Sequence, residues 1–500
     1  MARDIFDLER LHPAVEEFLR STNPWWEGKP GPALPPYRRW AFHSTLRKLE
    51  RGLAHAVVLR GPRQVGKTTL QLQIIETLLQ EKSIPPNRIL RIQFDEIPSL
   101  TGLSEPILTI GRWFENRILG ATFNESARKG EPALLFLDEV QNLPDWAPQL
   151  KALVDHHTVR VLVTDSSALR IEAGRDSLAG RITQVELGTL LLREIAGLRF
   201  GAELRPHLPE NGLDALLRRE FWQELRALGL QARDLRDRAF AEFSNRGGYP
   251  VSQARPDVPW AEVADHLNET VIQRAIQHDL RLGKRGLKRD AQLLEEVYRL
   301  ACRYAGQAPG QSIFVQEIRQ ALAGNVGWQR IRAYLQFLDG ALLLRLVKPL
   351  ELRLKRRKGN PKICLCDHGL RASWLQEVVP LDPSRLAQSP HLSDLAGHIA
   401  ESVAGYFLGG IPHLDVAHFP ERGIEPEVDF VLTIGEHRIP LEVKYRQRVD
   451  PHRDTLGLRA FLEKSVYNAP FGVLVTMNDD VEVPDPRIVP VPLRSFLLLY

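Results

Sequence analysis

The sequence predicts an α/β protein built from several domains, and three observations lead to this prediction. Five hundred residues exceed what one hydrophobic core usually holds, so roughly two to four domains are expected. Between residues 55 and 195, short apolar runs alternate with amphipathic helical patterns, which is typical of a parallel sheet covered by helices on both faces. The last part of the chain, residues 367–500, mixes a long helix with several strands.

Composition places the chain among globular proteins and indicates no membrane span. The apolar fraction is 43% and the charged fraction is 26%. No apolar run reaches the roughly 18 residues that a spanning helix needs, and the N-terminal segment lacks the apolar stretch of an export signal. The three cysteines fit neither a disulfide framework nor a zinc pattern, so a cytoplasmic location is expected. A net charge of +4 is too small to indicate nucleic acid binding by itself.

Residues 1–54 are expected to form an N-terminal arm that contains two short helices and the segment NPWW. The two tryptophans stand beside a proline in an extended stretch, and we expect them to anchor the arm onto the next domain. Residues 55–195 then carry the apolar strands AHAVVLR, RILRIQF, ALLFLDE and VRVLVTDSS.

The segment GPRQVGKTT follows the first of these strands and opens a helix. It fits the pattern G-x-x-x-x-G-K-[ST] in the strand-to-helix context that makes this pattern a phosphate-binding loop. Its glycines let backbone N–H groups surround phosphate oxygens, and the helix N-terminus adds partial positive charge. We expect Lys67 to reach the β and γ phosphates of ATP and the Thr68 hydroxyl to ligate Mg²⁺. The predicted nucleotide-binding residues are Gly61, Pro62, Arg63, Gln64, Val65, Gly66, Lys67, Thr68 and Thr69.

Two acidic residues end the strand of ALLFLDEVQNLPDW, at the sheet edge where ligands bind in open α/β folds. We expect Asp138 to hold magnesium, directly or through water, and Glu139 to polarise the attacking water as a general base. The next strand end, VLVTDSS, offers Thr164 or Ser166 as a sensor of the γ phosphate. These features predict ATP hydrolysis.

Residues 196–300 have an almost wholly helical pattern, broken at GGYP, and are expected to form a helical lid. Residues 301–366 follow the order helix, turn, helix and two strands, which is the outline of a winged helix. The two strands are joined by the basic turn RLKRRKG (residues 353–359), and a looser basic run, RLGKRGLKR, covers residues 281–289. Winged helices commonly touch the DNA backbone, but the same outline also serves as a protein-interaction module, so both readings stay open.

The stretch EPEVDFVLTIGEHRIPLEVKYR in the last domain is expected to form a β-hairpin that turns at Gly435 and Glu436. This turn places Asp429 directly opposite Glu442. Period-two alternation then places the charged side chains of the hairpin on one face, namely Glu427, Asp429, Glu442 and Lys444. Two carboxylates so close repel unless a cation lies between them, and Mg²⁺ favours such ligands. The sequence favours a metal site, and a solvated strand face is the alternative.

The succession of GPRQVGKTT, LLFLDEVQNLPDW, VTDSSA, DSLAGR and GGYP resembles a group of predicted bacterial and archaeal AAA-type ATPases. Members of that group join the ATPase to a C-terminal domain of unknown function with a restriction-endonuclease-like fold. The later segments CDHGL and VDFVL…PLEVK resemble that domain, so the resemblance covers the chain from about residue 55 onward. One strand end reads TDSS where TGSS is usual, and this departure weakens the assignment of the γ-phosphate sensor.

The resemblance implies roles for further residues. Arg181 of DSLAGR would stabilise transition-state charge, and if it acts in a neighbouring subunit the enzyme must be a homo-oligomer. Arg175 is a rival for this role, and an ion pair with a nearby carboxylate is the alternative. In the tail the resemblance implies a nuclease centre in which an acidic pair and a helical carboxylate hold magnesium while a lysine orients or deprotonates the attacking water. The residues at these positions are Asp429, Glu442, Glu401 and Lys444.

These expectations combine into an N-terminal arm (1–54), a P-loop AAA-type ATPase core (55–195), a helical lid (196–300), a winged-helix-like segment (301–366) and a restriction-endonuclease-like α/β domain (367–500). The expected function is the coupling of ATP hydrolysis to binding or remodelling of DNA, such as branched DNA, with a metal-dependent nuclease tail. One alternative is an ATP-operated switch or scaffold that binds proteins, and another is an ATP-gated defence nuclease. A further reading of the tail keeps DNA binding without cleavage.

Overall fold

The protein was analysed as a computed structural model that describes residues 11–95, 103–143, 145–166, 178–209, 212–277, 290–322, 324, 326–352, 355–356, 359–421, 423 and 425–500. The chain divides into two compact units. Unit 1 comprises Met1–Leu187 and Arg281–Gly286, and unit 2 comprises Gly188–Leu280 and Leu287–Tyr500. The finer division of unit 2 into lid, winged-helix-like and C-terminal domains stays a prediction. None of the described helices has the length and apolar character that crossing a membrane requires.

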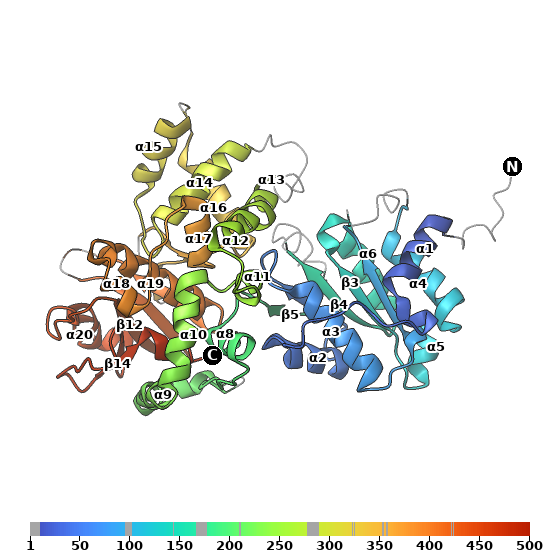
Figure 1. The fold of residues 1–500 in the computed structure, drawn as a ribbon, viewed down its shortest axis with the longest axis horizontal. Helices are drawn as coiled ribbons and strands as arrows, with labels where there is room; N and C mark the ends of the chain where they lie inside the picture. The colour runs from blue at the N-terminus through green and yellow to red at the C-terminus, as the bar shows by residue number, and fades with distance from the viewer. Residues whose placement is uncertain are drawn as a thin grey trace. The chain divides into compact units, whose positions relative to one another are not determined.

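Unit 1 contains a five-stranded sheet in the order β2-β3-β4-β1-β5 (Figure 1). All neighbouring strands run parallel, as the alternation of strands and helices predicts. The strands are β1 (Ala56–Arg60), β2 (Ile89–Gln93), β3 (Leu134–Asp138), β4 (Arg160–Asp165) and β5 (Ile182–Glu186). The first four were predicted. The edge strand β5 was not, because its sequence ITQVE is half polar and only partly buried.

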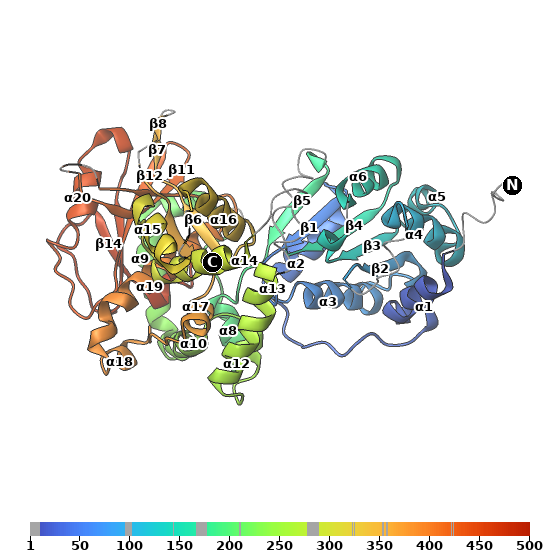
Figure 2. The same ribbon diagram turned by 90° about the horizontal axis from the view of Figure 1, so that it is seen from above.

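Helices cover both faces of this sheet. Figure 2 shows α2 and α3 on one face and α6 on the opposite face. The helices are α1 (Pro13–Thr22), α2 (Ala41–Arg51), α3 (Lys67–Gln80), α4 (Pro106–Phe114), α5 (Phe123–Arg128) and α6 (Trp146–His156). Alternate strand residues such as Val58, Leu135 and Val163 pack with α4 and α6 into one apolar core. Because all five strands run parallel, their carboxyl ends lie at one edge of the sheet, where α3 begins.

The N-terminal arm is fastened to the edge strand β2, as the NPWW segment predicts. The indole N–H groups of Trp25 and Trp26 both donate to the carbonyl of Ile89, at 3.2 and 2.8 Å. The buried side-chain amide of Asn23 donates to the backbone carbonyl of Arg91 at 2.8 Å. Its oxygen accepts from the backbone N–H of Arg91 at 2.6 Å. The arm therefore satisfies backbone groups that an exposed strand edge would leave unpaired.

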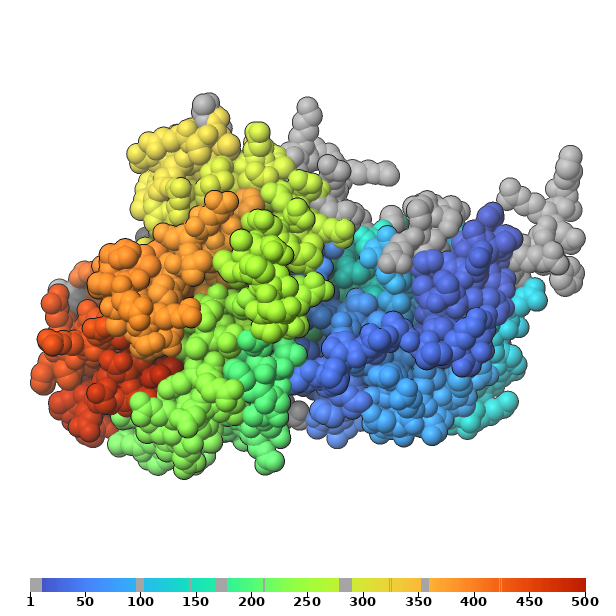
Figure 3. All heavy atoms as spheres, in the orientation of Figure 1, coloured from blue at the N-terminus to red at the C-terminus, as the bar shows by residue number. Residues whose placement is uncertain are grey.

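Unit 2 begins with the helical region that the sequence predicts. Its helices, up to the last hundred residues, are α8 (Leu192–Phe200), α9 (Arg219–Gln231), α10 (Arg233–Arg246), α11 (Pro250–Ala254), α12 (Trp260–Leu267), α13 (Arg274–Gln277), α14 (Ala291–Arg303), α15 (Gln311–Leu322), α16 (Trp328–Gly340), α17 (His368–Leu375) and α18 (Pro383–Leu386). The C-terminal residues, red in Figures 1 and 3, lie beside α9 and α10. The fully buried Arg236 of α10 holds this contact through Asp479 (2.8 Å) and Ser495 (2.9 Å).

A helix–turn–helix and an antiparallel pair of strands follow in the order predicted for residues 301–366. After α15 and α16, strand β6 (Leu344–Val347) pairs with β9 (Lys362–Leu365), and β7 (Glu351–Leu352) pairs with β8 (Lys355–Arg356). The side chains of the basic turn at residues 353–358 and the run at residues 281–289 lie outside the described residues, so their predicted contact with DNA stays a prediction.

The C-terminal sheet of unit 2 is mixed and has the order β10-β11-β12-β13-β14. Its strands are β10 (Asp415–Phe419), β11 (Val428–Ile434), β12 (His437–Lys444), β13 (Gly472–Thr476) and β14 (Ile488–Pro492), with α19 (Ser393–Gly409), α20 (Leu456–Leu462) and α21 (Leu493–Phe496) around them. The first three strands are antiparallel and the last two pairings are parallel. The predicted hairpin is confirmed, because Ile434 pairs with His437 across the turn and Gly435 has a φ of 57°.

The fastening of the arm gives a first prediction. Asn23→Ala leaves the N–H and carbonyl of Arg91 buried without a partner, so the cost is expected to be about 1–3 kcal/mol. The thermal unfolding midpoint should fall by about 2–4 °C for each kcal/mol. Ser21→Ala is the control, because Ser21 is an exposed residue near the end of the same helix whose hydroxyl bonds only locally. Equal midpoints for the two variants would contradict the role of Asn23.

Candidate functional site

The phosphate-binding loop joins β1 to α3 at the carboxyl edge of the sheet. Gly61 is required by a close approach, since a Cβ atom there would lie 2.1 Å from the carbonyl oxygen of Leu187. Gly66 has a φ of 90°, a left-handed conformation that favours glycine. Both glycines therefore have a structural reason besides the approach of phosphate to the backbone.

Lys67 begins α3, and its ammonium group lies in the hollow of the loop. Its Nζ donates to the carbonyl oxygens of Gly61 at 3.0 Å and Pro62 at 2.8 Å. Burial lowers the pKa of Lys67, while the carboxylate of Glu139 acts in the opposite direction. Hydrogen bonds from an ammonium to charged phosphate oxygens are stronger than those to neutral carbonyl oxygens. The Lys67 ammonium can therefore exchange its carbonyl acceptors for phosphate oxygens.

Asp138 ends β3 and is fully buried. Its Oδ1 accepts from the Thr68 hydroxyl at 3.2 Å and from the Thr164 hydroxyl, and its Oδ2 pairs with Nη2 of Arg91 at 2.6 Å. Burial raises the pKa of Asp138, and Arg91 opposes this rise. The predicted residues Thr68, Asp138 and Thr164 are therefore brought together. Arg91 was missed, although an arginine inside the apolar strand RILRIQF signals a buried ionic partner.

Glu139 follows directly and lies in the left-handed region with a φ of 52°. Its N–H donates to the Thr164 hydroxyl at 3.0 Å, and its Oε2 accepts from Ser166 at 3.0 Å and from Gln141. Burial raises the pKa of Glu139, but Lys67 and Arg63 outweigh burial, and the pKa falls below its usual value. The carboxylate thus stays ionised at neutral pH, as a general base requires.

Arg181 forms an ion pair with Asp155 at the surface of unit 1, with Nη2 3.0 Å from Oδ2. This is the alternative that the sequence left open for an arginine of this stretch. The rival Arg175 lies outside the described residues. The role of Arg181 in transition-state stabilisation stays a prediction.

The hairpin of unit 2 places Asp429 and Glu442 side by side, as predicted. The N–H of Val443 donates to Oδ2 of Asp429 at 2.8 Å, and the N–H of Asp429 donates to Oε2 of Glu442 at 3.4 Å. Lys444 donates to Oε1 of Glu442. Burial, together with the nearby Asp429, raises the pKa of Glu442 to about 8.

Glu401 of α19 points to the same place, and oxygens of Glu401, Glu427 and Asp429 lie within 4.8 Å of one another. A residue that the sequence did not suggest joins them. The buried Nζ of Lys362, on β9, lies 3.0 Å from Asp429 and 3.1 Å from Glu427, and it also bonds Glu401. Burial disfavours the charge on Lys362, but the three carboxylates outweigh burial and raise its pKa well above the usual value.

The ammonium of Lys362 stands where a metal ion would meet these carboxylates. Burial raises the pKa of Asp429, yet Lys362 and then Lys444 outweigh burial and bring it down to about 2. The carboxylates that the resemblance assigns to magnesium already have protein cations as partners, so this arrangement does not fit a divalent ion. The signal in the sequence was the lysine at the start of the apolar strand KICL.

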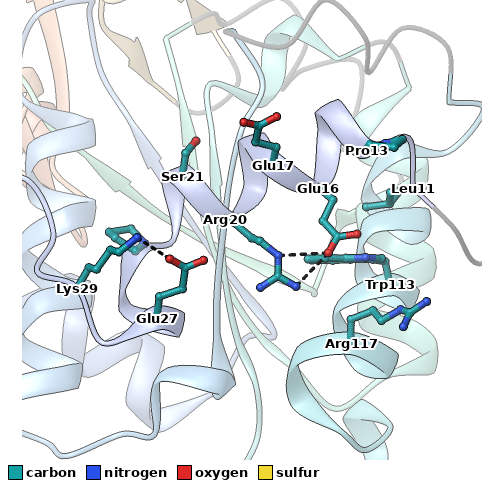
Figure 4. A pocket seen from close by; sticks show the side chains of 11 residues that line it. Leu11, Pro13, Glu16, Glu17, Arg20, Ser21, Glu27, Lys29, Trp113 and Arg117 are labelled. Carbon is teal, nitrogen blue, oxygen red and sulfur yellow. Dashed lines mark hydrogen bonds and ion pairs between the residues drawn. The ribbon is translucent and has the colours of Figure 1, made fainter.

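Residues of α1 and α4 line a surface groove in unit 1 (Figure 4). Four of its charged side chains are paired with one another, since Arg20 bonds Glu16 at 3.0 Å and Lys29 bonds Glu27 at 2.7 Å. No residue of the phosphate-binding loop lines it, and we assign it no ligand.

Comparison with protein families identifies unit 1 more closely. Residues 54–196 match the AAA domain. The AAA domain implies nucleotide binding and a nucleotide hydrolase, in agreement with the loop, the acidic strand end and the parallel sheet. Residues 237–379 match a second family model, described as a domain of unknown function.

Several proteins are similar in sequence to part of this chain. Two uncharacterized proteins, from Mycobacterium bovis and Mycobacterium tuberculosis, are each 27% identical over 369 residues. The alignments cover 71% of this chain but only 64% of each relative, less than two thirds of its length. An uncharacterized protein of Methanocaldococcus jannaschii is 31% identical over 146 residues, which is 29% of this chain and 28% of that protein.

The close approach at Gly61 gives a second prediction. Gly61→Ala places a methyl group against the Leu187 carbonyl, so the loop must move. The unfolding midpoint should fall, and the rise in midpoint produced by a non-hydrolysable ATP analogue should shrink. Gly31→Ala is the control, because a Cβ atom at Gly31 meets nothing within 4 Å. A Gly61→Ala variant with the wild-type midpoint and the wild-type response to the analogue would refute this explanation of the loop.

Proposed function

We propose that the AAA domain hydrolyses ATP in the presence of Mg²⁺. The observation that carries this proposal is the convergence of Lys67, Thr68, Asp138 and Glu139 at the carboxyl edge of one parallel sheet. The side chains fit a magnesium ion, because the Thr68 hydroxyl lies 3.2 Å from the Asp138 carboxylate. Thr68 and Asp138 would hold the ion, which when bound neutralises charge on the phosphate oxygens.

The residues of the chain would divide the remaining work. Lys67 would exchange the carbonyls of Gly61 and Pro62 for β and γ phosphate oxygens, which are stronger acceptors. Glu139, ionised and held by Ser166, would accept a proton from the attacking water. Thr164 bonds both the side chain of Asp138 and the backbone of Glu139. A contact between Thr164 and the γ phosphate would therefore alter the positions of both acidic residues.

Arg181 would act in a neighbouring subunit of a homo-oligomer. In the single chain it is neutralised by Asp155, so this role requires that the pair opens or that a phosphate competes for the guanidinium. The oligomer and the arginine finger are therefore the part of the proposal that depends on assembly.

Two substitutions separate binding from hydrolysis. Lys67→Ala removes the phosphate ligand and should abolish both nucleotide binding and turnover. Glu139→Gln keeps the shape and the loop, so it should bind ATP normally yet lose about 10²–10⁴-fold in rate, the usual contribution of a general base. Phosphate release and the binding of a fluorescent ATP analogue measure the two effects. Unimpaired turnover in Lys67→Ala would refute the site.

We further propose that unit 2 couples this hydrolysis to binding or remodelling of DNA, branched duplexes included. Support comes from the order of its elements, in which a helix, three antiparallel strands, a helix and a parallel strand follow one another as in restriction-endonuclease-like folds. The basic runs at residues 281–289 and 353–359 add charge suited to phosphates. Metal-dependent cleavage is not part of the proposal, because Lys362 occupies the cation position.

The rival function is an ATP-operated switch or scaffold that binds proteins, and DNA distinguishes the two. The ATPase rate of the wild type should rise with at least one of branched, duplex or single-stranded DNA, and the protein should be retained on that DNA at low salt. Lys67→Ala should be retained equally but show no stimulated hydrolysis, which controls for contaminating ATPases. If none of the three DNA forms changes the rate or retains the protein, the DNA proposal fails and the protein-binding switch is favoured.

A further inference from the structure

Three carboxylates of unit 2 converge in the way that a metal site requires. Glu401 comes from α19, Glu427 directly precedes β11, and Asp429 lies in β11; their oxygens lie within 4.8 Å of one another. Asp429 is almost fully buried, whereas the side chain of Glu427 is 47% exposed, so the cluster has one side open to solvent. Like charges at this distance repel strongly, so such a group takes up a proton or a positive charge at its centre. Burial and the nearby Asp429 raise the pKa of Glu401 well above its usual value.

The positive charge is supplied by the chain itself. Lys362 Nζ donates hydrogen bonds to Glu401 and Asp429 and forms an ion pair with Glu427 at 3.1 Å, so it has all three carboxylates as partners. The aromatic ring of Phe430, whose centroid lies 5.3 Å away, packs near the same ammonium. A divalent ion bound to these oxygens would have to share their centre with a charge of the same sign.

The strand that carries Lys362 is held from two directions. Lys362 pairs with Val347 in the β6–β9 ladder. On the other side the next residue, Ile363, exchanges backbone hydrogen bonds with Gly306 (2.7 Å) and Gln307 (2.9 Å). The N–H of Leu365 donates to the Ser402 hydroxyl of α19 at 2.8 Å. The ammonium of Lys362 is therefore positioned by a strand that is hydrogen-bonded on both sides. Because the side chain is also buried, it cannot leave the carboxylates as freely as an exposed lysine could.

The approach of this segment to α19 also has a steric requirement. Gly306 has a φ of 81°, and a Cβ atom there would lie 2.1 Å from the carbonyl oxygen of His398. Only glycine permits this contact, which brings the β9 region against the helix that carries Glu401. The arrangement thus depends on specific backbone geometry as well as on charge.

Glu442, the remaining acidic residue of the expected metal site, also has a lysine as its partner. Glu442 accepts from Lys444, and Asp429 stands between the two lysine–carboxylate groups. Four acidic side chains and two lysines therefore form one network of ion pairs and hydrogen bonds within the chain. Every carboxylate that the resemblance assigns to magnesium has a lysine partner.

We propose that Lys362 is the resident cation of the Glu401–Glu427–Asp429 cluster and excludes divalent metal ions from it. Unit 2 then keeps a nuclease-like fold but binds no metal at this place and cuts no DNA by a metal-dependent route. Removal of the ammonium converts the cluster into a divalent cation site. This inference does not depend on ATP hydrolysis, because it is tested without nucleotide.

The test compares Mn²⁺ binding to the full-length wild type and to Lys362→Met, measured as loss of the free Mn²⁺ signal in electron paramagnetic resonance. The wild type should bind no Mn²⁺ that depends on Asp429. Lys362→Met should gain a bound ion, and Lys362→Met/Asp429→Asn should lose it again. Lys464→Met is the matched control, since it removes an exposed lysine that pairs with Glu425 in the same unit and should create no site.

Loss of a buried partner can destabilise the variant, so thermal unfolding is measured in parallel. Mn²⁺ should raise the unfolding midpoint of Lys362→Met and leave that of the wild type unchanged. Lys362→Met/Glu401→Gln, which removes one of the repelling charges, is the second variant and should bind Mn²⁺ more weakly while folding better. Nicking of supercoiled DNA with Mn²⁺ is recorded in the same samples.

Two results would overturn the proposal. The first is Mn²⁺ binding or Mn²⁺-dependent nicking by the wild type that Asp429→Asn abolishes, because the lysine then does not exclude the metal. The second is a folded lysine variant that binds no Mn²⁺, because the carboxylates then form no cation site even without their ammonium. The wild-type measurement decides the first point whether or not the lysine variants fold.

Discussion

The constraint on which both sites depend is that a charge removed from water needs a partner of opposite sign. Asp138 is fully buried at the end of β3 and is compensated by Arg91 from the neighbouring strand β2. Lys362 is buried to the same degree and is compensated by carboxylates from α19 and β11. An unpaired charge at either position would cost several kcal/mol. The partners therefore determine how the surrounding strands and helices pack, and they also determine what chemistry each site can perform.

The same constraint has opposite consequences in the two units. Among the described residues of unit 1, Oδ1 of Asp138 accepts hydrogen bonds from hydroxyl groups, and the ammonium of Lys67 donates its hydrogen bonds to backbone carbonyls. Hydroxyl and carbonyl groups are weaker partners for a charge than ions are, so these positions can accept charged ligands. In unit 2 the carboxylates are bonded by ammonium groups, which are strong partners. Unit 1 is thus prepared to receive charged ligands, whereas the acidic cluster of unit 2 is already occupied by charges of its own chain.

How much of this was predictable follows from the distance along the chain between the interacting residues. The phosphate-binding loop and the acidic end of β3 were predicted because each is a contiguous segment with a strand beside it. The hairpin register was predicted because a two-residue turn determines the opposite residues. Arg91 and Lys362 were not predicted, because their partners Asp138 and Asp429 lie 47 and 67 residues away. Sequence shows a charge within an apolar strand, but only the fold shows which carboxylate meets it.

The acidic hairpin also illustrates why a sequence motif can be present without the chemistry that it predicts. Spacing alone placed Asp429, Glu442 and Lys444 on one face, and that geometry is present. The fold adds an ammonium from β9, a strand that belongs to the preceding helix–turn–helix segment and is held there by Ser402 and by the backbone near Gly306. A metal ion and a lysine both satisfy the same carboxylates, and a lysine on the same chain is held beside them at a high effective concentration. The lysine therefore stabilises the packing of β9 against α19 and β11, and its ammonium stands at the place where these carboxylates would meet a metal ion.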